Sequence, residues 1–237
     1  MEQEVVVVSV VRDTGMYQTC VRDTPNLAGC RLVCIDNREQ NRPVPVCYNE
    51  FLSANPSGWL VFCHEDWQAL EPLLPVLERL DPSHIYGPIG VFVEERPVCD
   101  HLLVRGAVRQ SGKDGSKPVL IRGLEPEGRV DTLDCQCLIV HASLVARAGL
   151  RFDERLGFDM YVEDFCAAAF EKAGIRTYAI PLDCLHRSAG RIARPFRQAL
   201  RYVRGKYAVS RKRYATIVGH LNTFGRHPLK PVRKIKK

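Results

Sequence analysis

The chain has 237 residues, of which 46% are hydrophobic and 26% are charged. This composition is typical of a folded globular protein and excludes a wholly disordered or collagen-like chain. No uncharged apolar run reaches the roughly 18 residues that a membrane-spanning helix requires. The acidic start, Met1–Glu4, lacks the basic residues that precede the apolar stretch of a secretory signal. We therefore expect a cytoplasmic protein.

Charge is distributed unevenly along the chain. Residues 1–183 contain 18 of the 34 Lys and Arg and all 27 Asp and Glu, a net charge of −9. Residues 184–237 contain the other 16 Lys and Arg and no acidic residue, a net charge of +16. This asymmetry predicts a globular domain over residues 1–190 and a basic helical extension over residues 191–237.

The ten cysteines indicate buried, reduced thiols rather than a disulfide framework or a zinc site. No pair has the Cys-x-x-Cys spacing. The close pair Cys135 and Cys137 lacks a second pair at the spacing of zinc ligands. In a chain of this length, free cysteines usually behave as small apolar side chains.

Strands and helices alternate along most of the chain. Continuous apolar runs predict strands at 5–11, 31–35, 59–63, 85–93, 135–140 and 177–180. Apolar residues at helical spacing predict helices at 48–54, 70–80, 141–149 and 163–173. The stretch 94–127 is rich in turn residues, and 111–116 has the composition of a hairpin or loop tip. The alternation favours an α/β fold with a mostly parallel central sheet flanked by helices.

Polar residues suited to chemistry follow one of the predicted strands. His64, Glu65 and Asp66 come directly after strand 59–63, and the carboxyl ends of strands line the ligand crevice of open α/β sheets. An imidazole and a carboxylate two residues apart can converge on one Mn²⁺ or Mg²⁺ ion that bridges two phosphates. The same tripeptide also suits a solvated acidic turn.

Other positions likewise admit a functional and a structural interpretation. Glu163 and Asp164 open a helix, where the helix dipole favours acids and where one carboxylate can act as a general base. His186 follows the last predicted strand, in a loop where histidine is more often structural. Asp36, at the end of a strand, can accept hydrogen bonds from a nucleoside or cap a turn.

The order of these residues resembles that of the family 2 glycosyltransferases of GT-A fold, in particular a divergent branch with His-x-Asp in place of Asp-x-Asp. The similarity covers roughly residues 5–190. The motifs that carry it are Leu32–Asn37, Tyr48-Asn49 with Ala54, Trp59–Asp66, Leu133–Leu138, Phe152–Glu154, Phe158–Cys166, and His186 with Gly190. The resemblance implies a GT-A type domain that binds a nucleotide sugar.

The resemblance also implies roles for the matched residues on the donor side. Asp66, His64 and His186 would bind a divalent metal, Mn²⁺ or Mg²⁺, that holds the donor diphosphate. The further residues that would contact the donor are Asp36, Asn37, Ser9, Glu65 and Asp134.

The implied reaction transfers a sugar from a nucleotide-diphosphate donor to a hydroxyl group of a saccharide or lipid-linked acceptor, in surface polysaccharide or glycolipid synthesis. Asp164 would be the catalytic base, with Glu163 in support, and a single displacement would invert the anomeric configuration. Cys135 stands where the family usually has a glycine near the sugar.

Two rival functions remain open. A nucleotidyltransferase would share the fold, but Val11–Gly15 lacks the Gly-rich basic loop that such enzymes usually need after the first strand. The second rival is a non-catalytic, transferase-like binding module whose basic tail engages a membrane or nucleic acid.

The basic extension itself has three interpretations. Arginines interleaved with apolar residues from Arg194 to Tyr207 suit an amphipathic helix on the anionic inner face of the cell membrane. The second interpretation is a basic helix packed on the acidic domain. Nucleic-acid binding is the least favoured, because no recognised nucleic-acid-binding module is present.

Overall fold

The structure is a computed structural model, and it describes residues 4–54, 56–95, 100–112, 116–188, 193–217 and 219–220. Gly190, Cys99, the centre of the loop tip 111–116 and the basic segment 221–237 lie outside these described residues.

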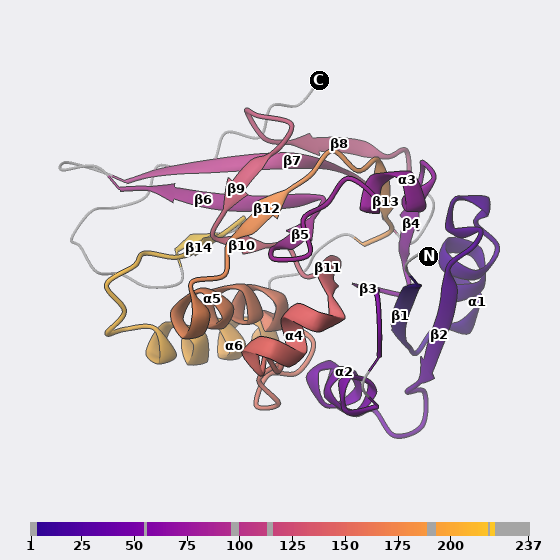
Figure 1. Ribbon diagram of the computed structural model, residues 1–237, viewed down its shortest axis with the longest axis horizontal. Coiled ribbons are helices and arrows are strands. Elements are labelled where there is room, and N and C mark those ends of the chain that lie inside the picture. Colours follow the sequence, from indigo (N-terminus) through magenta and orange to yellow (C-terminus); the bar gives the residue numbers. More distant parts are fainter. Residues whose placement is uncertain are drawn as a thin grey trace.

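A mixed sheet forms the centre of the molecule (Figure 1). Its seven strands are, in spatial order, β2 (Arg31–Asp36), β1 (Val5–Val11), β3 (Trp59–Cys63), β11 (Cys137–His141), β5 (Ile85–Gly87), β12 (Thr177–Ala179) and β9 (Gly128–Val130). The pairings place β1, β2, β3, β5 and β12 in one direction and β11 and β9 in the other. The predicted α/β class with a central sheet is confirmed, and two antiparallel strands interrupt its parallel set.

A second sheet shares a hydrophobic cluster with the first. It contains β10 (Thr132–Leu133), β6 (Ile89–Glu94), β7 (His101–Gln110), β13 (Cys184–His186) and β4 (Trp67–Ala69), with β8 (Val119–Arg122) paired to β7. The chain passes from one sheet to the other at Pro88, so the predicted strand 85–93 is in fact two strands. The turn-rich stretch 94–127 contains the whole of β7 and β8.

Helices cover the central sheet. The longer ones are α2 (Val44–Ser53), α4 (Ala142–Ala148), α5 (Tyr161–Ala173) and α6 (Arg194–Lys206), and the short ones are α1 (Thr14–Tyr17) and α3 (Leu73–Leu77). A π-helical turn (Gln18–Arg22) and a 3-10 turn (Pro25–Leu27) follow α1, and β14 (Ala215–Thr216) pairs with β15 (Gly219–His220). The helix predicted at 70–80 has only five residues, because Pro72 sets its start, whereas α5 ends at Gly174 as predicted. Of the nine cysteines in the described ranges none is bonded to another, and six are buried.

The basic helix α6 packs on the domain with its apolar side. Val203 and Tyr207 are buried, and Phe196 and Leu200 are partly buried, in a cluster that includes residues of α5. The exposed side carries arginines at positions 194, 197, 201 and 204. The apolar side that an amphipathic membrane helix would insert into a bilayer thus packs against the protein, completely at Val203 and Tyr207 and partly at Phe196 and Leu200. None of the helices in the described ranges is long and apolar enough to cross a membrane.

Candidate active site

The carboxyl ends of three parallel strands meet at one edge of the central sheet. β1 and β2 end at Val11 and Asp36, which pair with each other, and β3 ends directly before His64. β11 runs antiparallel to β3 and begins at the same edge, since Cys137 pairs with Cys63. The residues that precede β11 therefore lie beside those that follow β3, at the edge where open α/β sheets bind ligands.

Strand pairing in the second sheet brings His186 to this edge. β13 runs antiparallel to β4, and His186 pairs with Trp67. The backbone amide of Arg187 donates to the carbonyl oxygen of Asp66 at 3.0 Å. His186 is thus held next to Asp66, although the two are far apart in sequence.

His64, Asp66 and His186 form a compact and buried group. Nε2 of His186 lies 3.3 Å from Nδ1 of His64 and 3.3 Å from Oδ1 of Asp66. The distance between Nδ1 of His64 and Oδ1 of Asp66 is 3.9 Å. The three residues are only 7–9% exposed. The structure therefore brings together the three side chains that the sequence suggested as metal ligands.

Burial keeps the His64 ring neutral. Burial, and to a lesser extent His186, lower the pKa of His64 to about 3 against the opposing effect of Asp66. Nε2 of His64 lies 3.1 Å from the hydroxyl of Tyr161, which itself donates to the carbonyl oxygen of Cys135 at 3.0 Å. Since a tyrosine hydroxyl has one proton, Nε2 of His64 carries the proton in this contact and Nδ1 keeps its lone pair. This is a form of histidine that binds metal ions.

The chemistry of this donor set fits a divalent cation. Two imidazole nitrogens and one carboxylate oxygen lie within 4.8 Å of one another, and ions of the Mn²⁺ and Zn²⁺ class accept this combination. The ring of Phe158, which is half exposed, stacks on His64 with its centroid 4.7 Å away. Phe158 therefore forms part of the wall between this group and solvent.

A second group of ligand-type side chains lies beside the first. Asp134, Cys135 and Glu163 offer two carboxylate oxygens and a thiol within 4.8 Å of one another. Glu163 is 4% exposed, and its Oε2 has no hydrogen-bond partner among the described residues. Burial raises the pKa of Glu163 well above its usual range, and Asp134 and Asp159 raise it further.

The start of α5 positions both groups. Met160 precedes the helix with a φ of 66° and is fully buried. This left-handed conformation costs a residue other than glycine about 1 kcal/mol or more. The turn leads directly into Tyr161, whose hydroxyl joins the two groups, and into Glu163. Tyr161 was not predicted to be a site residue, because an aromatic residue at a helix start carries no specific signal.

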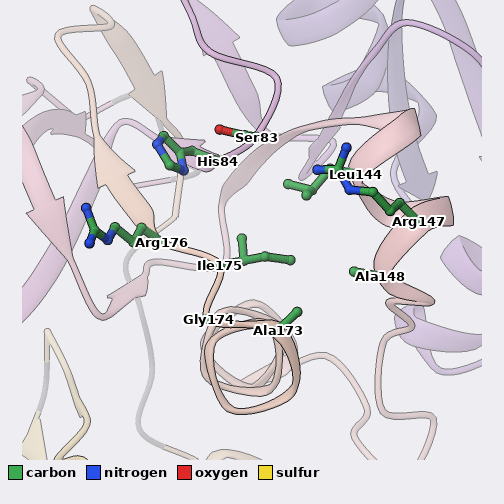
Figure 2. Close-up of a pocket in the computed structure, with 9 residues that line it drawn as sticks. All are labelled: Ser83, His84, Leu144, Arg147, Ala148, Ala173, Gly174, Ile175 and Arg176. Atoms are coloured by element: carbon green, nitrogen blue, oxygen red, sulfur yellow. The ribbon is translucent and has the colours of Figure 1, made fainter.

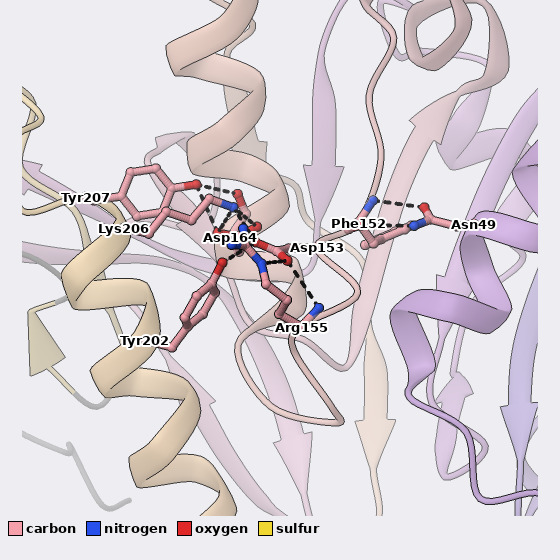
Figure 3. Close-up of polar contacts among 8 residues, drawn as sticks. All are labelled: Asn49, Phe152, Asp153, Arg155, Asp164, Tyr202, Lys206 and Tyr207. Carbon is pink, nitrogen blue, oxygen red and sulfur yellow. Dashed lines mark hydrogen bonds and ion pairs between the residues drawn. The ribbon is translucent and has the colours of Figure 1, made fainter.

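Asp164 is held by the basic helix α6 rather than by either group (Figure 3). Nζ of Lys206 lies 2.7 Å from Oδ1 and 2.8 Å from Oδ2 of Asp164, and the hydroxyl of Tyr207 donates to Oδ1 at 3.0 Å. Burial raises the pKa of Asp164, and the contacts with Lys206 and Tyr207 oppose this rise. Both oxygens of the carboxylate are therefore engaged.

The same lysine also holds Asp153. Nζ of Lys206 lies 2.9 Å from Oδ2 of Asp153, which accepts a further hydrogen bond from the hydroxyl of Tyr202 at 2.7 Å. Burial alone would raise the pKa of Asp153, but hydrogen bonds from Arg155, Lys206 and Tyr202 outweigh it and lower the pKa. One ammonium group thus joins α6 to the Phe-Asp-Glu segment and to α5.

Asp36 ends β2 and Asn37 follows it at the same edge, but only Asp36 is exposed. Hydrogen bonds from Arg38, with Nη2 2.6 Å from Oδ2, lower the pKa of Asp36 to about 2. Asn37 is fully buried; its Oδ1 accepts from the amide of Arg42 at 2.8 Å and its Nδ2 donates to the carbonyl of Arg42 at 2.9 Å. The side chain of Asn37 therefore closes the loop after β2.

The other three residues expected to contact a sugar donor, Ser9, Glu65 and Asp134, differ in their exposure to solvent. Ser9 is fully buried, and its hydroxyl lies 3.3 Å from Sγ of Cys63, the last residue of β3. Glu65 turns toward the loop after β1, where its Oε2 accepts from the amide of Asp13 at 2.9 Å. Asp134 is partly buried and accepts from Nε2 of Gln136 at 2.9 Å. Of these three, Asp134 lies in the second ligand-type group and Ser9 lies within the sheet.

A separate cavity of about 350 Å³ lies at the opposite edge of the sheet, beside the starts of β5 and β12 and the ends of α4 and α5 (Figure 2). It is lined by Ser83, His84, Leu144, Arg147, Ala148, Ala173, Gly174, Ile175 and Arg176. None of the residues that the sequence suggested for chemistry lines this cavity.

The fold is similar to that of known glycosyltransferase structures. No protein-family model and no curated protein sequence matches the chain. The crystal structure of GalNAc-T7 with UDP, GalNAc and Mn²⁺ matches with a TM-score of 0.52 at 9% identity, over 87% of this chain and 48% of that one. The crystal structure of S. aureus TarS 1-349 matches with a TM-score of 0.50 at 12% identity, over 88% of this chain and 66% of that one. The chain thus spans about half and just under two thirds of these structures, and its fold is of the GT-A glycosyltransferase type.

Proposed function

We propose that the chain transfers a sugar from a nucleotide-diphosphate donor to a hydroxyl group of an acceptor. The observation that carries the proposal is the convergence of His64, Asp66 and His186 at the carboxyl edge of a GT-A type sheet. A neighbour of the same fold, GalNAc-T7, was crystallised with UDP, GalNAc and Mn²⁺, which supports a nucleotide sugar and a divalent ion as the ligands of this edge.

On the donor side, His64, Asp66 and His186 would hold a divalent ion, Mn²⁺ or Mg²⁺, that binds the diphosphate. When bound, such an ion neutralises the negative charge that develops on the leaving group. Asp66 supplies the anionic ligand, and His64 supplies the lone pair on Nδ1. Asp36 binds the nucleoside, because its carboxylate is exposed at the end of β2 and ionised at neutral pH.

On the acceptor side, a carboxylate at the start of α5 takes the proton of the attacking hydroxyl. We assign this step to Glu163, whose Oε2 has no partner in the described part of the chain. Asp164, the base that the resemblance implies, has both oxygens engaged by Lys206 and Tyr207. Burial raises the pKa of Glu163, and a carboxylate with a raised pKa is a stronger base than an ordinary one.

The displacement forms one bond and breaks one bond at the anomeric carbon. The acceptor oxygen attacks this carbon, the bond to the donor phosphate breaks, and the nucleoside diphosphate leaves with the electron pair. Attack from the side opposite to the leaving group inverts the configuration. The order of motifs in the sequence supports an assignment to family 2, with His64 in the His-x-Asp position.

The acceptor in this proposal is a saccharide or a lipid-linked saccharide of surface polysaccharide or glycolipid synthesis. Because the apolar side of α6 packs on the domain, contact with an anionic membrane would fall to the exposed arginines at 194, 197, 201 and 204.

A thermal-shift screen of nucleoside diphosphates and nucleotide sugars, with and without Mn²⁺, tests the proposal. A ligand that binds only the folded state raises the Tm by mass action. We expect one nucleotide class to raise the Tm, more so with Mn²⁺, and we expect Asp66→Asn to abolish the Mn²⁺-dependent part. Asp23→Asn, at an exposed turn position, is the matched control. A folded protein whose Tm responds to no nucleotide would contradict the proposal.

A non-catalytic binding module is the second candidate, because His64 leaves the metal-binding group with a single carboxylate. Mn²⁺-dependent hydrolysis or transfer of the sugar from the nucleotide identified by the screen distinguishes the two. Binding without turnover, in the presence of a range of hydroxyl acceptors, would favour the module.

A further inference from the structure

We propose that Asp134, Cys135 and Glu163 form a second cation site, selective for thiophilic divalent ions such as Zn²⁺ and separate from the site of His64, Asp66 and His186. An ion bound there takes up the carboxylate that we assign to proton removal, so Zn²⁺ switches transfer off. This consequence depends on the proposed function, whereas the site itself does not.

The side chains are already arranged as ligands. One carboxylate oxygen each from Asp134 and Glu163 and the Sγ atom of Cys135 lie within 4.8 Å of one another. An ion between atoms at this separation needs only small side-chain movements to reach metal–ligand distances of about 2.0–2.3 Å. Asp134 is oriented by Gln136, whose Nε2 donates to Oδ2 of Asp134 at 2.9 Å.

Glu163 supplies the observation that points to a ligand. Its side chain is almost completely buried, at 4% exposure, and Oε2 contacts no donor in the described residues. Buried polar atoms are nearly always paired with protein, water or an ion. In the described ranges, no lysine or arginine forms an ion pair with Glu163, Asp134 or the neighbouring Asp159. The Cys135 thiol thus has two carboxylates within 4.8 Å and a third acid, Asp159, acting on it electrostatically, and a divalent cation would supply the missing positive charge.

The thiol determines the class of ion. A thiolate is a soft ligand that favours Zn²⁺, Co²⁺ or Cd²⁺ over Mn²⁺ and Mg²⁺, which prefer oxygen. The first group has no sulfur among its ligand atoms and therefore does not make this distinction. On binding, the Cys135 thiol loses its proton to solvent as the metal–sulfur bond forms.

The two sites lie close enough to affect the same reaction. The hydroxyl of Tyr161 contacts Nε2 of His64 at 3.1 Å and the backbone carbonyl of Cys135 at 3.0 Å. An ion at the second site would therefore lie beside the carboxyl edge of the central sheet without replacing an ion at the first site.

A titration with Co²⁺ tests the site directly, because a cobalt–thiolate bond gives a charge-transfer absorption band in the near ultraviolet. We expect this band in the wild-type chain, its loss in Cys135→Ser, and its displacement by Zn²⁺ but not by Mn²⁺. Cys34→Ser, which changes an exposed cysteine elsewhere, is the matched control and keeps the band. Glu163→Gln should weaken Co²⁺ binding at least tenfold, and His186→Ala should leave the band in place.

A folded wild-type chain without the band, or a band that persists in Cys135→Ser, would overturn the site. If Cys135→Ser fails to fold, Asp134→Asn provides the second variant and should weaken the band. The absorption does not require catalysis, so a chain that shows the band but transfers no sugar would refute the proposed function and leave the site standing. A chain that transfers sugar equally well when Zn²⁺ occupies the thiol site would refute the inhibitory role.

Discussion

Tyr161 and His64 are joined by a 3.1 Å contact between the tyrosine hydroxyl and Nε2 of the imidazole. Because the hydroxyl gives its own proton to the carbonyl of Cys135, the contact sets the tautomer of His64 and leaves Nδ1 to face His186 and Asp66. Residues that orient a metal-binding histidine through its other nitrogen are part of how a protein tunes metal affinity. The first residue of α5 thereby prepares a ligand that comes from the end of β3.

Removing this hydroxyl should weaken metal binding without unfolding the chain. In Tyr161→Phe, His64 loses the acceptor for its Nε2 proton, and we expect Mn²⁺ affinity to fall about tenfold or more. Calorimetric titration with Mn²⁺ measures the change. Tyr214→Phe, a buried tyrosine whose hydroxyl bonds to Glu171 instead, should bind Mn²⁺ as the wild type does. Equal affinities in the two variants would show that the tautomer has no influence.

Lys206 should be among the most important charged residues for stability. Its ammonium group is the common partner of Asp153 and Asp164, whose side chains are 9% and 1% exposed. Lys206→Ala leaves both carboxylates without this partner, and we expect a loss of about 3 kcal/mol in the free energy of unfolding.

Urea denaturation measures this loss. Arg201→Ala, on the exposed side of the same helix, is the control and should change the free energy by no more than about 0.5 kcal/mol. Because none of the proposed metal ligands, His64, Asp66 and His186, lies on α6, folded Lys206→Ala should keep its Mn²⁺ affinity. A stability equal to that of Arg201→Ala would mean that the contacts of Lys206 contribute nothing.

Glu163 should make the protein less stable as the pH rises. Its folded-state pKa is raised by burial, so between the unfolded value of about 4.3 and the folded value the folded chain binds more protons. The stabilisation is complete below the unfolded pKa and is lost as the pH rises through the folded pKa.

The variant Glu163→Gln removes this dependence. We expect its Tm to exceed that of the wild type by roughly 2–4 °C near pH 8, equivalent to about 1 kcal/mol, and to match it near pH 4. Melting curves across this range, with Glu78→Gln at an exposed position as the control, test the prediction. A Tm difference that does not change with pH would contradict it.

The role of α6 can be tested at its buried face. Val203 is fully buried whereas Val209 is 87% exposed, so the two allow a matched pair of Val→Ala substitutions. Val203→Ala should lower the free energy of unfolding by about 2 kcal/mol, because it removes buried methyl groups and leaves a cavity. Val209→Ala should leave stability unchanged.

Flotation with anionic vesicles separates packing from membrane insertion. If the apolar side of α6 packs on the domain, folded Val203→Ala floats to the same extent as the wild type. Reduced flotation with an unchanged Tm would instead show that Val203 inserts into the bilayer.

The elements that carry the site follow from local sequence. Val5–Val11 and Trp59–Cys63 are apolar runs that form strands buried on both faces, so the polar residues after them lie at the carboxyl edge of the sheet. Glu163 and Asp164 stand in the first turn of a helix that ends at a glycine. Each of these features depends on residues that are close together in the chain, and periodicity and turn chemistry are sufficient to predict them.

Tertiary structure alone decided which side chains meet. His186 reaches Asp66 because β13 pairs with β4, and no local pattern encodes a pairing between such distant segments. Adjacent residues on a helix point about 100° apart, so Glu163 faces Cys135 while Asp164 faces Lys206. The sequence places Glu163 and Asp164 in the first turn of α5. Only the packing of α6 on the domain determines that Asp164 pairs with Lys206 while Glu163 is left without a cation among the described residues.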